Sequence, residues 1–320
     1  MPRQSSLGYL AVVVPRLGKR HLPLSRDELM LLMAALNELF LGLDIALAHS
    51  ISGTITRFEW IPIVFGPLAA GLLLLAGLMA RRNREAASIL ATVVFLLSIL
   101  VGLVGAYLHW IRAILPNALP GQRVSIPLLV WAPPILGPLT FCLVGLIGLS
   151  AAWIEVPPDS GVLTLPRLRR LALPYSKTRA YLFMIGLGTL ATVISSVLDH
   201  ARTAFANPWL WIPTVAGIFA TTVAIGLGSL RRPEPKEIAT FAWTMGALIV
   251  VGSVGALLHI QENLTSQGTV VGERFLRGAP FLAPLLFANM GALGLIALLN
   301  PAEPGAQASA AAEVASLATC

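Results

Sequence analysis

Long runs of apolar residues alternate along the chain with short polar and basic segments. Eight of these runs are close to the roughly 20 residues that a helix needs to cross a bilayer. We expect spanning helices at about 29–49, 61–80, 89–109, 127–151, 181–200, 210–229, 238–259 and 279–299. The pattern therefore predicts an all-α integral membrane protein with eight transmembrane helices, and the even number puts both termini on one side.

The composition agrees with a polytopic membrane protein. Of the 320 residues, 56% are hydrophobic and 12% are charged, whereas an average soluble domain has roughly 25% charged residues. This balance excludes a disordered chain and an ordinary water-soluble enzyme. Cys142 lies in an apolar run and Cys320 ends the chain, so the two cysteines do not form a disulfide framework.

Basic residues are distributed unevenly between the two faces that the eight spans define. The chain has 22 Lys and Arg residues and a net charge of +7. Only six of them fall on the face opposite the termini, namely Arg57, Arg112, Arg123, Arg202, Arg274 and Arg277. By the positive-inside rule, we expect the protein to lie in the inner membrane of a cell with both termini on the cytoplasmic side. The positive charge thus reflects topology, and we expect lipids as partners and no nucleic acid.

Several sequence landmarks recur in the same order about 150 positions apart. The triplet at 60–62 recurs at 211–213, and the segment 101–109 recurs at 251–259 with seven of nine residues unchanged. Pro138 and Gly145 recur as Pro284 and Gly291. This predicts a tandem repeat of two four-helix bundles, inserted in the same orientation because four is an even number.

The repeat divides the chain into five parts. We expect a cytoplasmic arm at 1–28, a first four-helix repeat at 29–151 and a cytoplasmic connector at 152–180. A second four-helix repeat would occupy 181–300, followed by a disordered tail at 301–320, which is rich in Ala, Ser and Glu.

Four of the five histidines fall at the outer ends of the first and third helices of the two repeats. His49 corresponds to His200, and His109 corresponds to His259. Two imidazoles from neighbouring helices could ligate a heme b axially or hold a transition metal ion. Alternatively, each histidine could interact with the dipole and last carbonyl groups of its helix.

Acidic residues within or beside the spans are candidates for a proton path or for supporting the histidines. Glu38 lies near the middle of the first span, three turns before His49 on the same stripe, where a proton path to the imidazole or a neutral, hydrogen-bonded carboxyl are both reasonable. Asp44 points about 140° away from His49 around the helix. Asp199 precedes a histidine directly, and Glu262 follows His259 by three residues.

The overall layout is similar in outline to heme A synthase, which also joins two parallel four-helix bundles with a histidine pair in each. The similarity covers no motif. The nearest approach to that family's acidic residue before a histidine–arginine pair is the segment 199–202, Asp-His-Ala-Arg, so neither an activity nor site residues are carried over.

These patterns favour a heme- or metal-binding subunit of a membrane redox system, with a role in electron transport. A transporter or channel for protons or a small solute is the first alternative, using Glu38, Asp44 and Asp199. The second is a cofactor-free accessory subunit that binds other subunits of a membrane complex. Motifs for nucleotide phosphates, zinc proteases and covalently attached heme are missing from the sequence, and no catalytic residue can be assigned.

Overall fold

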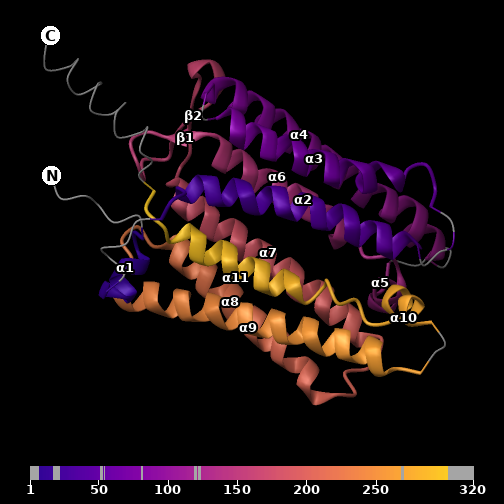
Figure 1. Ribbon diagram of the computed structural model, residues 1–320. Helices are drawn as coiled ribbons and strands as arrows, with labels where there is room; N and C mark the ends of the chain where they lie inside the picture. Colours follow the sequence, from indigo (N-terminus) through magenta and orange to yellow (C-terminus); the bar gives the residue numbers. More distant parts are fainter. Residues whose placement is uncertain are drawn as a thin grey trace, which may run out of the picture.

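The computed structural model describes residues 7–16, 22–50, 53, 55–80, 82–118, 121, 124–267 and 270–301. It shows a bundle of long helices that run side by side (Figure 1). The short helix α1 (Leu10–Val13) lies at the same end as the C-terminal part of the last helix, where the Tyr9 amide donates to the Leu298 carbonyl at 3.0 Å. The expected tail falls almost entirely outside the described residues.

The first half of the chain supplies four main helices, α2 (Arg26–Ser50), α3 (Trp60–Met79), α4 (Arg84–His109) and α6 (Leu136–Ala152). Helix α4 continues through a π turn (Trp110–Ile114) and a 3-10 turn (Leu115–Asn117), and the short helix α5 (Ile126–Trp131) precedes α6.

The second half has the same order of elements. It consists of α7 (Lys177–Ala201), α8 (Trp211–Ser229), α9 (Pro235–Thr265), the short helix α10 (Val271–Arg277) and α11 (Leu285–Ala297). A 3-10 turn (Pro208–Leu210) leads into α8.

A small antiparallel sheet joins the two halves, which the sequence analysis treated only as a connector. Its strands are β1 (Ile154–Glu155), β2 (Val162–Thr164) and β3 (Arg170–Ala172), in the order β1-β2-β3, with a 3-10 turn (Pro166–Leu168) before β3. The buried Glu155 carboxylate accepts hydrogen bonds of 2.8–3.1 Å from the backbone N–H groups of Asp159, Gly161 and Lys177. These bonds tie the connector to the first turn of α7.

Six of the helices in the described part of the chain are long and apolar enough to cross a membrane. They begin or end within a few residues of the first, second, third, fifth, sixth and seventh expected spans. Their outward side chains are largely apolar, as with Leu78 on α3 and Val250 on α9, which are more than 60% exposed. These features support a membrane-spanning protein.

The fourth and eighth expected spans form shorter helices because proline interrupts each of them. Pro133 and Pro134 separate α5 from α6, and Pro280 and Pro284 precede α11, since proline lacks the N–H group that a helix interior requires. Helix α6 has 17 residues and α11 has 13, which correspond to about 26 Å and 20 Å against a hydrocarbon core of about 30 Å.

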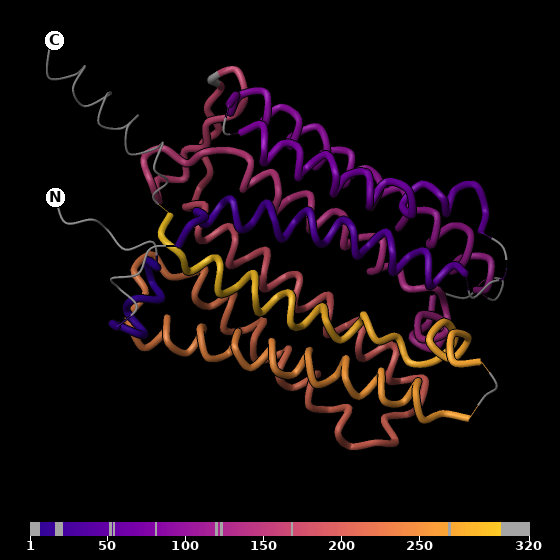
Figure 2. Tube along the Cα trace, viewed as in Figure 1, coloured from indigo at the N-terminus to yellow at the C-terminus, as the bar shows by residue number. Residues whose placement is uncertain are grey.

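The helices of each half run side by side (Figure 2), and each main helix packs against two others of its half. Helix α3 packs against α2 and α4, and α6 packs against α4 and α2; in the second half α8 packs against α7 and α9, and α11 against α9 and α7. Between the halves, α6 contacts α7 and α11 contacts α2. Helices α2, α6, α7 and α11 therefore form the interface between the two halves.

Glycines allow the closest helix contacts at matched places. A Cβ on Gly102 of α4 would lie 2.9 Å from the Pro138 carbonyl oxygen of α6. A Cβ on Gly252 of α9 would lie 2.7 Å from the Pro284 carbonyl oxygen just before α11. Small residues of this kind let helices in a membrane approach closely.

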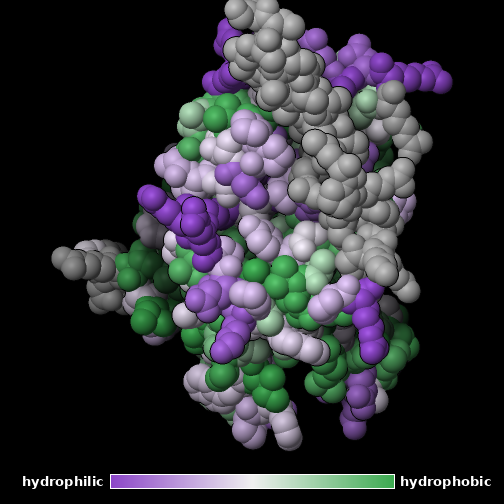
Figure 3. All heavy atoms as spheres, turned by 90° about the vertical axis from the view of Figure 1, so that its left-hand side faces the viewer, coloured by the Kyte–Doolittle hydropathy of each residue, from purple (hydrophilic) through white to green (hydrophobic). Residues whose placement is uncertain are grey.

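The end of the bundle that carries α1 and the sheet has many strongly hydrophilic side chains (Figure 3). Its exposed arginines include Arg82, Arg84, Arg169, Arg231 and Arg232. This is the end that the sequence analysis identified as the more basic one.

Candidate functional site

The first expected histidine pair comes together at the opposite end of the bundle. The imidazole rings of His49 on α2 and His109 on α4 have their centroids 6.1 Å apart, with an interplanar angle of 67°. The Nδ1 atom of His109 lies 3.0 Å from the Pro134 carbonyl oxygen, and the Nδ1 atom of His49 lies 3.3 Å from Oε1 of Glu59.

The second pair has nearly the same arrangement. The rings of His200 on α7 and His259 on α9 have their centroids 6.4 Å apart at 89°. The Nδ1 atom of His259 lies 3.1 Å from the Pro280 carbonyl oxygen. The ring of Phe205 packs edge-on against His200, at 6.1 Å between centroids.

The proline breaks explain the carbonyl partners. Pro134 and Pro280 lie in the non-helical segments before α6 and α11, so their carbonyl groups are not part of a regular helix. A neutral imidazole whose Nδ1 donates a proton to such a carbonyl presents Nε2 as its acceptor and ligand atom. The sequence analysis did not foresee these carbonyl partners or Glu59, because loops bring them back to the helix ends.

Glu38 lies at the centre of the first bundle, completely buried. The Ser98 hydroxyl on α4 is 2.5 Å from Oε1 of Glu38 and 2.9 Å from the Phe141 carbonyl oxygen of α6. The other carboxyl oxygen, Oε2, is buried without a hydrogen-bond partner in the described part of the chain. Glu38 thus contacts α4 through Ser98, and Ser98 joins this contact to α6.

The other acidic candidates lie elsewhere. Asp44 is exposed on α2, and its carboxyl interacts electrostatically with that of Asp199 on α7. Asp199 lies 3.8 Å from the Arg202 guanidinium. Glu262 is exposed, and the structure does not bring it to His259, whose Nδ1 bonds Pro280 instead.

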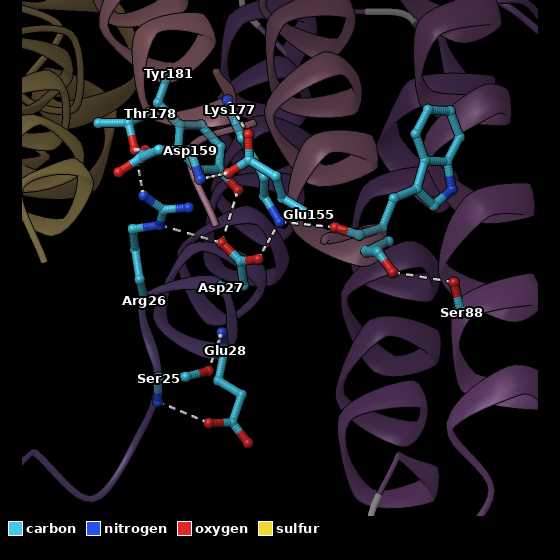
Figure 4. Close-up of polar contacts among 12 residues, drawn as sticks. Ser25, Arg26, Asp27, Glu28, Ser88, Glu155, Asp159, Lys177, Thr178 and Tyr181 are labelled. Atoms are coloured by element: carbon cyan, nitrogen blue, oxygen red, sulfur yellow. Dashed lines mark hydrogen bonds and ion pairs between the residues drawn. The ribbon is translucent and has the colours of Figure 1, made fainter. Parts of the chain in front are cut away.

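A network of buried charges, which the sequence analysis missed, joins the halves at the basic end (Figure 4). Lys177 at the start of α7 forms an ion pair with Oδ2 of Asp27 on α2, and its ammonium also donates to the Trp153 carbonyl at 2.7 Å. The Tyr181 hydroxyl donates to Oδ1 of Asp27 at 3.1 Å, and the neighbouring Arg26 guanidinium lies 3.4 Å from the same oxygen. The sequence grouped Lys177 and Arg26 with the other basic residues of this face.

The contacts in this network are reciprocal. Arg26 donates to the Thr178 hydroxyl at 2.7 Å, while Lys177 pairs with Asp27. With the offset of 151 that relates His49 to His200, Arg26 corresponds to Lys177 and Asp27 to Thr178. Each basic residue therefore contacts the counterpart of its own successor, as in an interface related by a two-fold axis. In the sequence, the shared offset of 151 was the signal that could have indicated this pairing of Arg26 and Asp27 with Lys177 and Thr178.

A cavity of about 440 Å³ opens beside this network. Its walls include Tyr9, Arg179, Arg231 and the apolar side chains of Leu182 and Leu227. Burial, and then the charge of Asp159, raises the pKa of the Tyr9 phenol above its usual value. The Arg179 guanidinium donates to the Gly228 carbonyl at 2.7 Å and so caps the end of α8.

No group of three or more His, Cys, Asp or Glu side chains within the described ranges is placed to hold a metal ion. The histidines form two pairs instead. Comparison with known proteins finds no matching family model, curated protein or solved structure.

Proposed function

We propose that the protein is the heme-binding subunit of a membrane redox system, with one bis-imidazole site in each half. One observation carries this proposal. In both halves two imidazole rings from the first and third helices meet at 6.1 and 6.4 Å, and the third-helix histidine holds its Nδ1 atom on a backbone carbonyl.

These separations fit two imidazoles bound to opposite sides of one metal ion. With metal–nitrogen distances of about 2 Å, the ring centroids of such a pair lie about 6 Å apart. Histidine ligands characteristically donate their second N–H group to a carbonyl or carboxylate, which fixes the tautomer and the orientation of the ring. Pro134, Pro280 and Glu59 supply such partners here.

The donor set favours heme over a bare metal ion. A zinc site usually takes three or four protein ligands, whereas a heme iron already has four porphyrin nitrogens and needs two axial ligands. Two imidazoles in each half match the second requirement. A heme bound in this way would supply one-electron transfer, and the chain's own part is to fix the two rings.

The same proposal includes the architecture. Eight spans would form two parallel repeats at 29–151 and 181–300. The protein would lie in the inner membrane with both termini on the cytoplasmic side. The matched glycine contacts and the reciprocal pairs between α2 and α7 support a duplication. Lipids and other subunits of an electron-transport complex would be the partners.

The test is an absorption spectrum and metal analysis of protein purified gently in detergent, before and after addition of hemin. We expect a Soret band, two hemes per chain, and loss of one heme in each of the variants His109→Ala and His259→Ala. The variant His21→Ala is the control, because this histidine belongs to neither pair. A folded protein that stays colourless with hemin would contradict the proposal, and bound copper without pigment would replace heme by a metal ion.

A further inference from the structure

The buried carboxyl of Glu38 has one oxygen engaged and one unpartnered. Ser98 lies 2.5 Å from Oε1, whereas Oε2 has no hydrogen-bond partner in the part of the chain that the structure describes. A charged carboxylate with an unpartnered oxygen in such a place is costly. Glu38 is therefore not explained as a packing residue alone.

Ser98 can serve both protonation states of this carboxyl. Its hydroxyl has a single hydrogen but lies within bonding distance of two oxygens, one of Glu38 and one of the Phe141 carbonyl. When Glu38 is protonated, it donates to the Ser98 oxygen and Ser98 donates to Phe141. When Glu38 is ionised, rotation of the hydroxyl lets Ser98 donate to the carboxylate.

Few other ionisable groups lie on the helices around Glu38. Helices α3 and α11 contain none, and α6 contains only Cys142. The ionisable groups of α4 (Arg84, Glu85, Tyr107, His109), of α7 (Lys177, Arg179, Tyr181, Asp199, His200) and of α10 (Glu273, Arg274, Arg277) lie near the ends of the bundle. On α2 itself the nearest is Asp44, six residues away and exposed.

The Glu38–Ser98 contact is in register with the first histidine pair. Glu38 precedes His49 by 11 residues on α2, and Ser98 precedes His109 by 11 residues on α4. At the corresponding positions the second half has Thr189 and Leu248, both completely buried, and the Thr189 hydroxyl bonds its own helix at Ile185. The first histidine pair therefore has an acidic residue three helical turns inward, and the second pair has none at the corresponding position.

We propose that Glu38 and Ser98 form a proton-binding site that compensates charge at the His49–His109 pair and has no equivalent in the second half. This inference rests on the proposed function. When a one-electron donor reduces the cofactor of the first half, the Glu38 carboxylate takes a proton from the aqueous phase and forms an O–H bond. One negative and one positive charge enter together, so the net charge of the bundle interior is unchanged.

The size of the coupling follows from the helix geometry. Eleven residues at 1.5 Å each separate Glu38 from His49 by about 16 Å along α2. With an effective dielectric constant of about 20, one added electron at this distance raises the proton affinity of a carboxylate about fivefold. The reduction equilibrium of the first site should therefore differ about fivefold between low and high pH.

The experiment uses the variant His259→Ala, in which only the first site binds heme, and measures its reduction equilibrium over a pH series. We expect the further change Glu38→Gln to lower the pH dependence of this equilibrium by about fivefold, whereas the part that Glu59 contributes beside His49 remains. The substitution Glu85→Gln, at the exposed start of α4, is the matched control. In the variant His109→Ala, which keeps only the second site, Glu38→Gln should leave the pH dependence unchanged. A pH dependence that is unchanged by Glu38→Gln would overturn the proposal.

Infrared spectroscopy of cofactor-free protein separates this inference from the proposed function. A carboxylic C=O band that titrates with pH and is lost in Glu38→Gln supports the proton-binding site, and Ser98→Ala should shift the band because the carboxyl loses its partner. Absence of any titrating band overturns the site even if heme binds. If no preparation binds heme, the proposed function and the coupling both fail, while the band still decides whether Glu38 binds a proton.

Discussion

Asp27 on α2 and Lys177 on α7 form an ion pair in which the side chains are only 4% and 1% exposed. They are 150 positions apart and join the two halves of the protein. Removing one partner of a buried pair leaves an uncompensated charge, which is far more costly than losing an exposed pair.

We therefore expect Lys177→Met to lower the free energy of unfolding by about 3 kcal/mol, the lower end for a broken buried pair, because Arg26 and Tyr181 still contact Asp27. The measurement is thermal or denaturant unfolding in detergent. Glu273→Gln, which breaks the mostly exposed pair between Glu273 and Arg277 at 3.2 Å, is the control and should cost less than about 1 kcal/mol. Equal effects of the two substitutions would show that the buried pair has no special role in joining the halves.

Gly252 and Gly246 on α9 provide a test of the helix contacts. A Cβ on Gly252 would lie 2.5 Å from the Ala288 amide nitrogen, whereas a Cβ on Gly246 meets nothing within 4 Å. We expect Gly252→Ala to destabilise the protein by about 1–3 kcal/mol through overpacking. Gly246→Ala should be neutral or stabilising by up to about 1 kcal/mol, because alanine favours the helix. The same unfolding assay checks both, and the reverse order would contradict the close contact of α9 with α11.

Glu59 and Glu262 test which acidic residues support the histidines. Glu59 lies 3.3 Å from Nδ1 of His49, so Glu59→Gln, which removes the negative charge beside this imidazole, should weaken cofactor binding by about 10- to 100-fold, the usual effect of changing a ligand's hydrogen-bond partner. Glu262→Gln should leave binding unchanged, since Pro280 occupies Nδ1 of His259. Hemin titration followed by absorption measures both. Weaker binding in Glu262→Gln alone would instead favour the pairing expected from the sequence.

Asn263 tests the loop between α9 and α11. Its side chain is 1% exposed and makes two hydrogen bonds of 2.8 Å with the backbone of Ala279. Asn263→Leu should cost about 1–3 kcal/mol, because it leaves the N–H and C=O groups of the half-buried Ala279 without their partner. Gln261→Ala, on the exposed side of α9, should have little effect on unfolding.

Asn263, Leu264 and Thr265 match the N-glycosylation pattern Asn-X-Ser/Thr. The same two hydrogen bonds determine whether the Asn263 amide is accessible for this modification. A side-chain amide that is buried and bonded on both sides is not accessible to a modifying enzyme once the loop has folded. We expect no glycan at Asn263 when the protein is expressed in a glycosylating host, as mass spectrometry would show. A glycan on the folded protein would contradict the placement of this side chain.

The apolar pattern predicted most of the helices because a span needs little more than length and hydrophobicity. It predicted the ends of α2, α4 and α7 within a few residues. It did not predict the break before α6, although Pro133 and Pro134 stand there, because the run remains apolar through them. The connector's sheet was also missed, since Glu155 organises it through backbone N–H groups that no pattern records.

For the candidate site, regular spacing along helices proved more informative than residue type. His49 and His109 were expected to pair because both end an outward-running helix, and the structure places their rings 6.1 Å apart. Their partners at Glu59 and Pro134 depend on how loops fold back, which periodicity does not encode. Asp44 is close to His49 in sequence, but its position on the helix points it away from that imidazole and towards Asp199. Glu262 is close to His259 in sequence, but the Pro280 carbonyl occupies Nδ1 of that histidine.

The reciprocal contacts of Arg26 with Thr178 and of Lys177 with Asp27 have a consequence for assembly. A self-complementary surface of this kind is satisfied by two copies and leaves no such surface for a third. Here both copies would belong to one chain, so this surface is already used within the monomer. A contact with another molecule would therefore form elsewhere on the protein, and the outer sides of α3, α4, α8 and α9 are apolar.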